Sequence, residues 1–142
     1  TLKLLADAWR MAQEIDMAIP VLEKAAKMSK DGDTYVLLGN LYLFEDRMED
    51  SIRAIEAGLK KPKVKSRSQA LLVLGQAHFE LQNFEEAKKQ FRAAARDKNK
   101  RIKKTANSWI KYAENEEIRV KNLALRRDFI QQSKAKSKAK NS

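Results

Sequence analysis

A degenerate internal repeat is the feature of this sequence that most constrains its fold. When three segments are aligned on the small residues Ala6, Gly39 and Gly75, the spacings between them are 33 and 36 residues. A period of this length is typical of a supersecondary unit that buries its apolar face only by stacking on its neighbours, so it predicts a repeat array. The other matching positions are Leu2, Tyr35 and Leu71; Leu5, Leu38 and Leu74; Trp9, Tyr42 and His78; Ile15, Met48 and Phe84; Ala18, Ser51 and Ala87; Leu22, Ile55 and Phe91; and Ala25, Gly58 and Ala94.

Within each segment the apolar residues recur at spacings of three and four, which is the pattern of an amphipathic helix. The chain has only 4 Gly and 2 Pro, which suits long helices with short connections. The small residues predict close approach of paired helices, and the bulky residues Trp9, Tyr42, Phe84 and Phe91 are expected in the core. The expected helices span about residues 2–12, 16–29, 33–45, 48–59, 67–81 and 84–97.

Three stretches resemble tetratricopeptide repeats. Residues 35–42 (YVLLGNLY) and 71–78 (LLVLGQAH) look like the first helix of such a repeat, and residues 83–87 (NFEEA) look like its turn into the second helix. The departures are Ser51 in place of Ala, His78 in place of an aromatic residue, and a single repeat-ending proline, Pro62. The resemblance implies an all-α fold, a right-handed α-solenoid of three helix-turn-helix repeats at about residues 1–31, 32–67 and 68–99.

The pattern changes after Asn99. Ile102, Ala106, Trp109 and Ala113 lie at spacings of four, three and four, which predicts one further helix over the last repeat. Because open arrays need a terminal cap with a polar outer face, we expect residues 100–133 to form a capping and C-terminal helix. Residues 134–142 are rich in Lys and small residues, and we expect them to form a basic flexible tail.

No constellation of residues indicates catalysis. The chain has no Cys and one His, so thiolate chemistry, paired-His metal sites and Ser-His-Asp arrangements have no support. The acidic residues Glu45, Asp46, Glu49 and Asp50 lack the ligand series and central Gly of a calcium loop. We therefore expect a protein that is not an enzyme, with no catalytic residues, no metal and no cofactor.

The expected binding surface is the concave face lined by the first helix of each repeat. By helical spacing, Lys3 and Asp7 also point to this face, and apolar residues there would accept an extended or helical segment of a protein partner. The sequence thus favours a protein-protein interaction scaffold. The candidate partner-binding residues are Arg10, Val36, Asn40, Leu43, Leu72, Gln76 and Phe79.

The basic charge leaves an alternative open. The formal net charge is +11, and residues 118–142 contain eight basic residues and one acidic residue, Asp128. Such a tail could bind nucleic acid or an anionic membrane surface. No aromatic residue interleaves the lysines, so base stacking has no support, and protein binding is the favoured reading. No run of eighteen apolar residues is present, so no transmembrane segment is expected.

A second resemblance is narrower. The run DMAIPVLEKAAK at residues 16–27 and the segment SWIKYAE at residues 108–114 are similar to bacterial tetratricopeptide proteins that accompany TonB-type energy-transduction systems. This resemblance implies a periplasmic accessory of a transport complex, so the periplasm is favoured over the cytoplasm. The abrupt start at Thr1 suggests a piece of a longer protein. The partner, the number of preceding repeats and the oligomeric state stay open.

Overall fold

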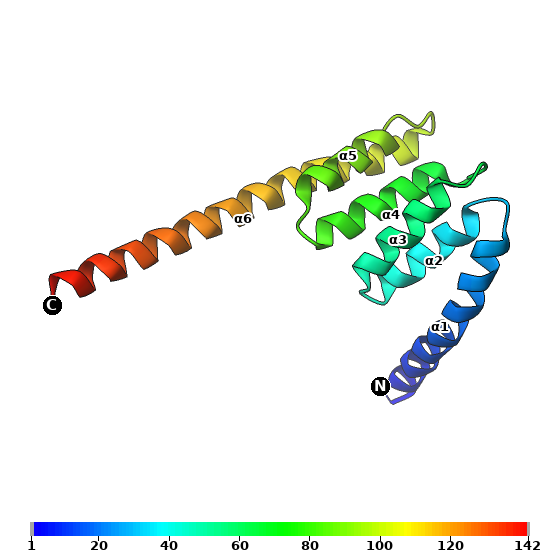
Figure 1. Cartoon of the computed structure of the whole chain (residues 1–142), viewed down its shortest axis with the longest axis horizontal. Helices are drawn as coiled ribbons and strands as arrows, with labels where there is room; N and C mark the ends of the chain where they lie inside the picture. The colour runs from blue at the N-terminus through cyan, green and yellow to red at the C-terminus, as the bar shows by residue number, and fades with distance from the viewer. Residues whose placement is uncertain (1, 142) are drawn as a thin grey trace.

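The computed structural model describes residues 2–141, and these fold into helices without a sheet (Figure 1). The all-α class is therefore confirmed. Helices α2 with α3 and α4 with α5 form two packed hairpins, and the long helices α1 and α6 flank them. The helices are α1 (Leu2–Met28), α2 (Asp33–Phe44), α3 (Met48–Leu59), α4 (Arg67–Glu80), α5 (Phe84–Ala94) and α6 (Lys100–Lys140).

The two hairpins close around the glycines that define the repeat. A Cβ atom at Gly39 would lie 2.6 Å from Cγ1 of Ile55, and one at Gly75 would lie 2.7 Å from Cδ1 of Phe91. Ser51, which replaces the usual Ala, is fully buried, and its hydroxyl donates to the carbonyl of Gly39 at 2.7 Å. The small residues thus allow the contact between paired helices that the repeat pattern predicts.

Both hairpins use the same turn. Asp46 and Gln82 occupy equivalent repeat positions, seven residues after Gly39 and Gly75, and both adopt a φ of 61°. The following amides, of Arg47 and Asn83, each donate at 2.8 Å to the carbonyl five residues earlier. A left-handed residue that closes the end of a helix in this way lets the chain reverse within a few residues.

The two hairpins are joined at their connecting loops by Asp33. The N-cap of α2 is Gly32, and Asp31 Oδ1 accepts a hydrogen bond from the Asp33 amide at 3.1 Å. The Asp33 carboxylate accepts from the Ser66 amide at 3.0 Å and from the Ser66 hydroxyl at 2.6 Å. These hydrogen bonds from Ser66 lower the pKa of Asp33, so the ionised carboxylate links the start of α2 to the start of α4.

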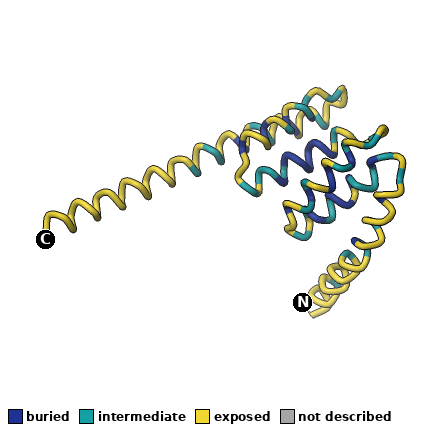
Figure 2. The backbone as a smooth tube through the Cα atoms, in the orientation of Figure 1, coloured by how far each residue is buried: buried dark blue, intermediate teal, exposed yellow. Residues whose placement is uncertain are grey.

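The first repeat differs from its expected form. Residues 2–12 and 16–29 were expected to be two helices, but α1 runs unbroken from Leu2 to Met28. Ala12, Gln13 and Glu14, at the expected turn, are all strong helix formers and favour continuation of the helix. Trp9, expected in the core, is 71% exposed, because only the C-terminal half of α1 packs on α2 (Figure 2). The α1 residues in this contact are Ile15, Ile19 and Leu22.

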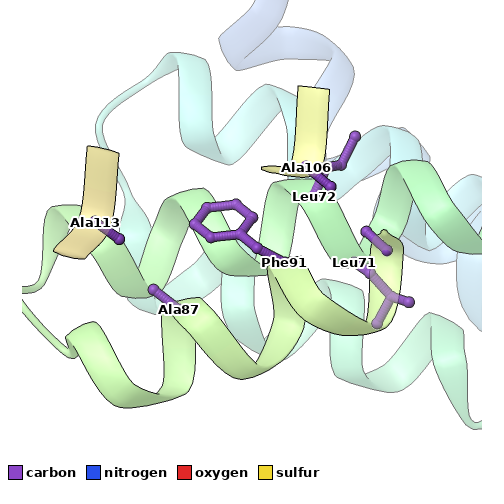
Figure 3. Close-up of a cluster of buried hydrophobic side chains, with 7 residues drawn as sticks. Leu71, Leu72, Ala87, Phe91, Ala106 and Ala113 are labelled. Atoms are coloured by element: carbon purple, nitrogen blue, oxygen red, sulfur yellow. The ribbon is translucent and has the colours of Figure 1, made fainter. Parts of the chain in front are cut away.

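Helix α6 covers the last hairpin and then projects beyond it (Figure 1). Asn99 caps it by accepting from the Arg101 amide at 2.9 Å, so the expected helix begins at Lys100. Its residues Ala106 and Ala113 are fully buried against a cluster that includes Phe91 (Figure 3). The described residues form two helix hairpins and not three, so a solenoid of three stacked repeats stays a prediction.

The projecting part of α6 starts after a set of ion pairs. Lys88 of α5 pairs with Glu85 at 2.9 Å and with Glu117 of α6 at 3.0 Å. Hydrogen bonds to Glu85, and then to Glu117, raise the pKa of Lys88. Residues 121–141 are exposed on every side (Figure 2). The expected flexible tail at 134–142 is helical up to Lys140 and turns at Asn141, whereas Ser142 lies outside the described residues.

Candidate protein-interaction surface

Four of the residues expected at the binding surface lie on the first helices of the two hairpins. Asn40 and Leu43 are one turn apart on α2, and Gln76 and Phe79 are one turn apart on α4. All four are partly buried. Helices α2 and α4 pack side by side and run in the same direction (Figure 1), so the two pairs occupy equivalent places on neighbouring helices.

Val36 and Leu72 were expected to be exposed on this surface, and that expectation is wrong. Val36 is 3% exposed and Leu72 is 4% exposed. Val36 packs α2 against α4 in a cluster with Val73 and Leu74. Leu72 packs α4 against α6 in the cluster that contains Ala106 (Figure 3). The apolar side chains at this repeat position therefore join each first helix to the next, and they leave no free side chain for a partner.

Arg10 is separated from the other candidates. It lies on the N-terminal half of α1, which diverges from α2 (Figure 1). Its guanidinium is exposed and pairs with Asp7 at 3.7 Å and with Glu14 at 3.9 Å on the same helix. The structure does not bring Arg10 to the surface of α2 and α4, since the hairpin that would have placed it there is a straight helix.

Phe79 belongs to a cluster of aromatic rings contributed by three helices. Its ring lies 5.8 Å from Phe84 of α5 and 5.8 Å from Trp109 of α6, both edge-to-face, and 5.1 Å from Tyr112 of α6. Phe91 stacks on Trp109, with ring centroids 5.4 Å apart. Phe79 therefore holds α6 against α4, and much of its surface is already used inside the molecule.

The cluster ends in an exposed hollow that sequence reasoning did not identify. Trp109 is partly buried and Tyr112 is 55% exposed. Together with Lys104, Thr105 and Ser108 they line an open depression of about 490 Å³. An exposed aromatic ring beside an apolar hollow is typical of a binding surface. The sequence signal that could have revealed this hollow is the spacing of three residues between Trp109 and Tyr112, which places both rings on one face of a helix.

A second exposed aromatic residue was also missed. Phe44, next to Leu43 at the end of α2, is 72% exposed. The phenol of the neighbouring Tyr42 points to α1 instead, where it donates to Glu23. Burial, and then this bond to Glu23, raises the pKa of Tyr42 to about 12. Tyr42 therefore stays neutral and holds α1 on α2, while Phe44 is available to solvent.

The described residues hold no set of three or more His, Cys, Asp or Glu side chains that could bind a metal ion. No helix among them combines the length and apolarity needed to span a bilayer. His78, which occupies the repeat position of Tyr42, is partly buried, and its Nδ1 atom makes no hydrogen bond. The arrangement offers side chains for recognition of a partner: exposed aromatic rings, amides and partly buried apolar groups.

Comparison with known families identifies the last hairpin. A family model described as tetratricopeptide repeat matches residues 68–96, which include all of α4 except its first residue and the whole of α5. No curated protein and no solved structure matches the chain significantly. Tetratricopeptide repeats are in general non-catalytic modules for protein-protein interaction, which suggests protein partners. From the match, the helix hairpin and its glycine contact, we conclude that residues 68–96 of this chain form a tetratricopeptide repeat.

Proposed function

We propose that this protein is a scaffold that binds a segment of a partner protein on the surface of α2, α4 and α6. We define this recognition surface by Asn40, Leu43, Phe44, Gln76 and Tyr112. The observation that carries the proposal is the exposure of two aromatic side chains, Phe44 at 72% and Tyr112 at 55%. They lie on either side of α4, on helices held together by the buried residues Val36 and Leu72.

The chemistry of the recognition surface favours an apolar segment with free backbone groups. Aromatic side chains are enriched at protein interfaces and among the residues that dominate binding energy, which gives Phe44 and Tyr112 the anchoring role, and Leu43 adds apolar contact. Asn40 and Gln76 each present a donor and an acceptor, and no intramolecular hydrogen bond of their side chains occurs among the described residues. Since a single amide hydrogen bond contributes about 0.5–1.5 kcal/mol net, these residues set the register of the segment and add little affinity.

The experiment compares two double variants with the wild type. Phe44→Asp with Tyr112→Asp removes the anchors, and both side chains are exposed enough for the fold to survive. Ile118→Asp with Leu125→Asp is a matched control, because these residues of α6 are 57% and 67% exposed and lie outside the recognition surface. Each immobilised protein is used to capture partners from the source cells, and the captured proteins are identified by mass spectrometry.

We expect the wild type and the control to retain a common dominant partner that the Phe44 and Tyr112 variant loses. Photo-crosslinking from a benzoylphenylalanine at position 44 then locates the partner segment. Capture of the same proteins by all three forms would place the binding site elsewhere. The similarity of residues 16–27 to TonB-associated proteins makes a component of a bacterial transport complex the first partner to test, in periplasmic extract.

The projecting end of α6 supports a second candidate function. Residues 118–142 carry eight basic residues and one acidic residue, and the described part is a helix exposed on every side beyond residue 120. Such a charge distribution favours a polyanion, nucleic acid or an anionic membrane, through contacts that weaken steeply with salt. Deletion of residues 123–142 should then abolish salt-sensitive binding to DNA or to phosphatidylserine vesicles. Binding that survives the deletion would exclude this segment as the site.

A further inference from the structure

The apolar face of α1 is the largest feature that the recognition surface does not explain. Three repeat positions that are buried in both hairpins, those of Leu5, Ala6 and Ala25, are exposed on α1. Leu5 is 57% exposed, whereas its counterparts Leu38 and Leu74 are 2% and 3% exposed. Trp9 is 71% exposed, whereas Tyr42 at the same repeat position is 5% exposed. The residues of a paired helix are therefore present on α1, but the partner helix is absent.

The second half of α1 shows the same discrepancy. Ala25 is exposed, whereas its counterparts Gly58 and Ala94 are buried. In the α2–α3 hairpin, a Cβ atom at Gly58 would lie 2.8 Å from the Cβ of Tyr35. The small residue at position 58 therefore allows the first helix of the hairpin to pack closely against the second. The equivalent pair in α1 is Leu2 and Ala25. The two halves of α1 thus carry the two sides of one helix-helix contact.

The straight form of α1 prevents this contact within one chain. Gln13, equivalent to the turn residues Asp46 and Gln82, lies inside the continuous helix. At a rise of 1.5 Å per residue, Leu2 and Ala25 of one helix are about 35 Å apart. A second α1 running antiparallel would bring Leu2 of one copy to Ala25 of the other, and each contact would occur twice about a two-fold axis near Gln13.

We propose that α1 is the exchanged element of a symmetric dimer. The N-terminal half of α1 in each copy takes the place of the first helix of a repeat against the C-terminal half of α1 in the other copy. The new interface continues an existing one, because Ile15, Ile19 and Leu22 already pack α1 against α2. Exchange of identical elements costs little, since the contacts are those that the repeat would make within one chain.

The charge of α1 is compatible with the binding of a second α1 to its apolar face. Residues 2–28 contain four basic residues and four acidic residues, so two α1 helices do not repel each other. The basic residues that would repel a second copy are concentrated on α6, outside this interface.

The first test measures mass. Light scattering coupled to size-exclusion chromatography should give twice the 16.3 kDa of one chain at micromolar concentrations. Trp9→Glu should halve the mass, and it should not unfold the single chain, because Trp9 is exposed in it. Leu125→Glu, at a similarly exposed residue of α6, is the matched control and should stay dimeric. A wild-type chain that remains monomeric up to hundreds of micromolar, or a Trp9→Glu variant that stays dimeric, would overturn the proposal.

The second test identifies which residues meet. The chain has no Cys, so a Leu2→Cys, Ala25→Cys variant reports only on this pair. Mild oxidation should give a disulfide-linked dimer on a non-reducing gel. The control Leu2→Cys, Lys27→Cys places the second thiol on another face of α1 and should crosslink far less. A monomer with an internal disulfide would show that α1 folds back on its own chain, and absence of a crosslink would show that this face is unpaired; either result rejects the exchange.

Discussion

The ring of Phe91 stacks on the indole of Trp109, with ring centroids 5.4 Å apart and planes inclined by 16°. Phe91 is fully buried, and its opposite neighbour is the backbone of α4 at Gly75. The Phe91 ring of α5 thus contacts both α4, the first helix of its own repeat, and α6, the helix that covers this repeat. Because α6 supplies Tyr112 to the recognition surface, this stack also positions part of the proposed binding site.

Trp109→Ala should destabilise the protein strongly. Truncation of a buried aromatic residue costs about 3–5 kcal/mol, and the partial exposure of Trp109 reduces the expected loss to about 2–4 kcal/mol. The free energy of unfolding from urea titration measures the effect. Tyr112→Ala is the control, and we expect a loss of about 1 kcal/mol or less, since Tyr112 is 55% exposed. Equal losses for the two variants would show that the stack on Phe91 is not the main contact.

Gly75→Ala should destabilise the protein although alanine is the better helix former. The propensity gain is about 1 kcal/mol, but the new Cβ atom would lie 2.7 Å from Cδ1 of the fully buried Phe91. Overpacking of this kind costs about 1–3 kcal/mol. Thermal unfolding followed by circular dichroism should show a lower Tm. Asn115→Ala, on the exposed face of α6, should leave the Tm unchanged or raise it slightly, and a raised Tm for Gly75→Ala would contradict the packing of the hairpin.

Asp33→Asn should reduce the stability of the protein at neutral pH and should make that stability less dependent on pH in the acidic range. The hydrogen bonds from Ser66 lower the pKa of Asp33 in the folded state. The stabilisation is therefore complete above the pKa of an unfolded Asp, about 3.9, and is lost as the pH falls through the lower folded pKa. Tm values should differ between wild type and variant at pH 7 and converge at pH 2. A constant difference across this range would mean that the charge of Asp33 does not join the two hairpins.

Deletion of residues 123–142 should leave the Tm nearly unchanged. The described residues beyond 121 are exposed on every side of α6, so the deletion removes almost no buried surface. The mean residue ellipticity at 222 nm should also change little, because both parts of the chain are mainly helical. A large fall in Tm would reveal contacts of the projecting helix with the rest of the protein.

Much of the hairpin structure was predictable because it depends on neighbours in sequence. The glycines 39 and 75 and the aromatic residue Phe91 indicate paired helices, and the structure brings them into contact. The prediction for α1 was wrong because the same pattern is compatible with two conformations. Gln13 can occupy a turn, as Gln82 does, but the adjacent helix formers Ala12 and Glu14 favour a straight helix when no packed partner holds the hairpin closed.

The binding surface was less predictable than the helices. Periodicity shows that Val36 and Leu72 lie one turn before Asn40 and Gln76, but it cannot show which helix covers that turn. The structure buries both side chains between successive first helices, and it exposes Phe44 and Tyr112 instead. Phe79 was expected as a partner anchor, and its ring packs on Trp109 and Tyr112. The partner-binding role of Asn40, Leu43 and Gln76 stays a prediction.

The sequence by itself determined the helical class, the two hairpins and the start of α6. Apolar spacing and the Asn99 cap act within one or two turns of the chain, and the small residues act between helices that follow each other directly in sequence. The tertiary structure decided which apolar side chains are buried between helices and which face solvent. Burial depends on the position of a neighbouring helix, and a local sequence pattern does not specify that position. It also decided that α1 stays straight, since the choice between a hairpin and a continuous helix depends on whether a packed partner holds Leu5 and Trp9.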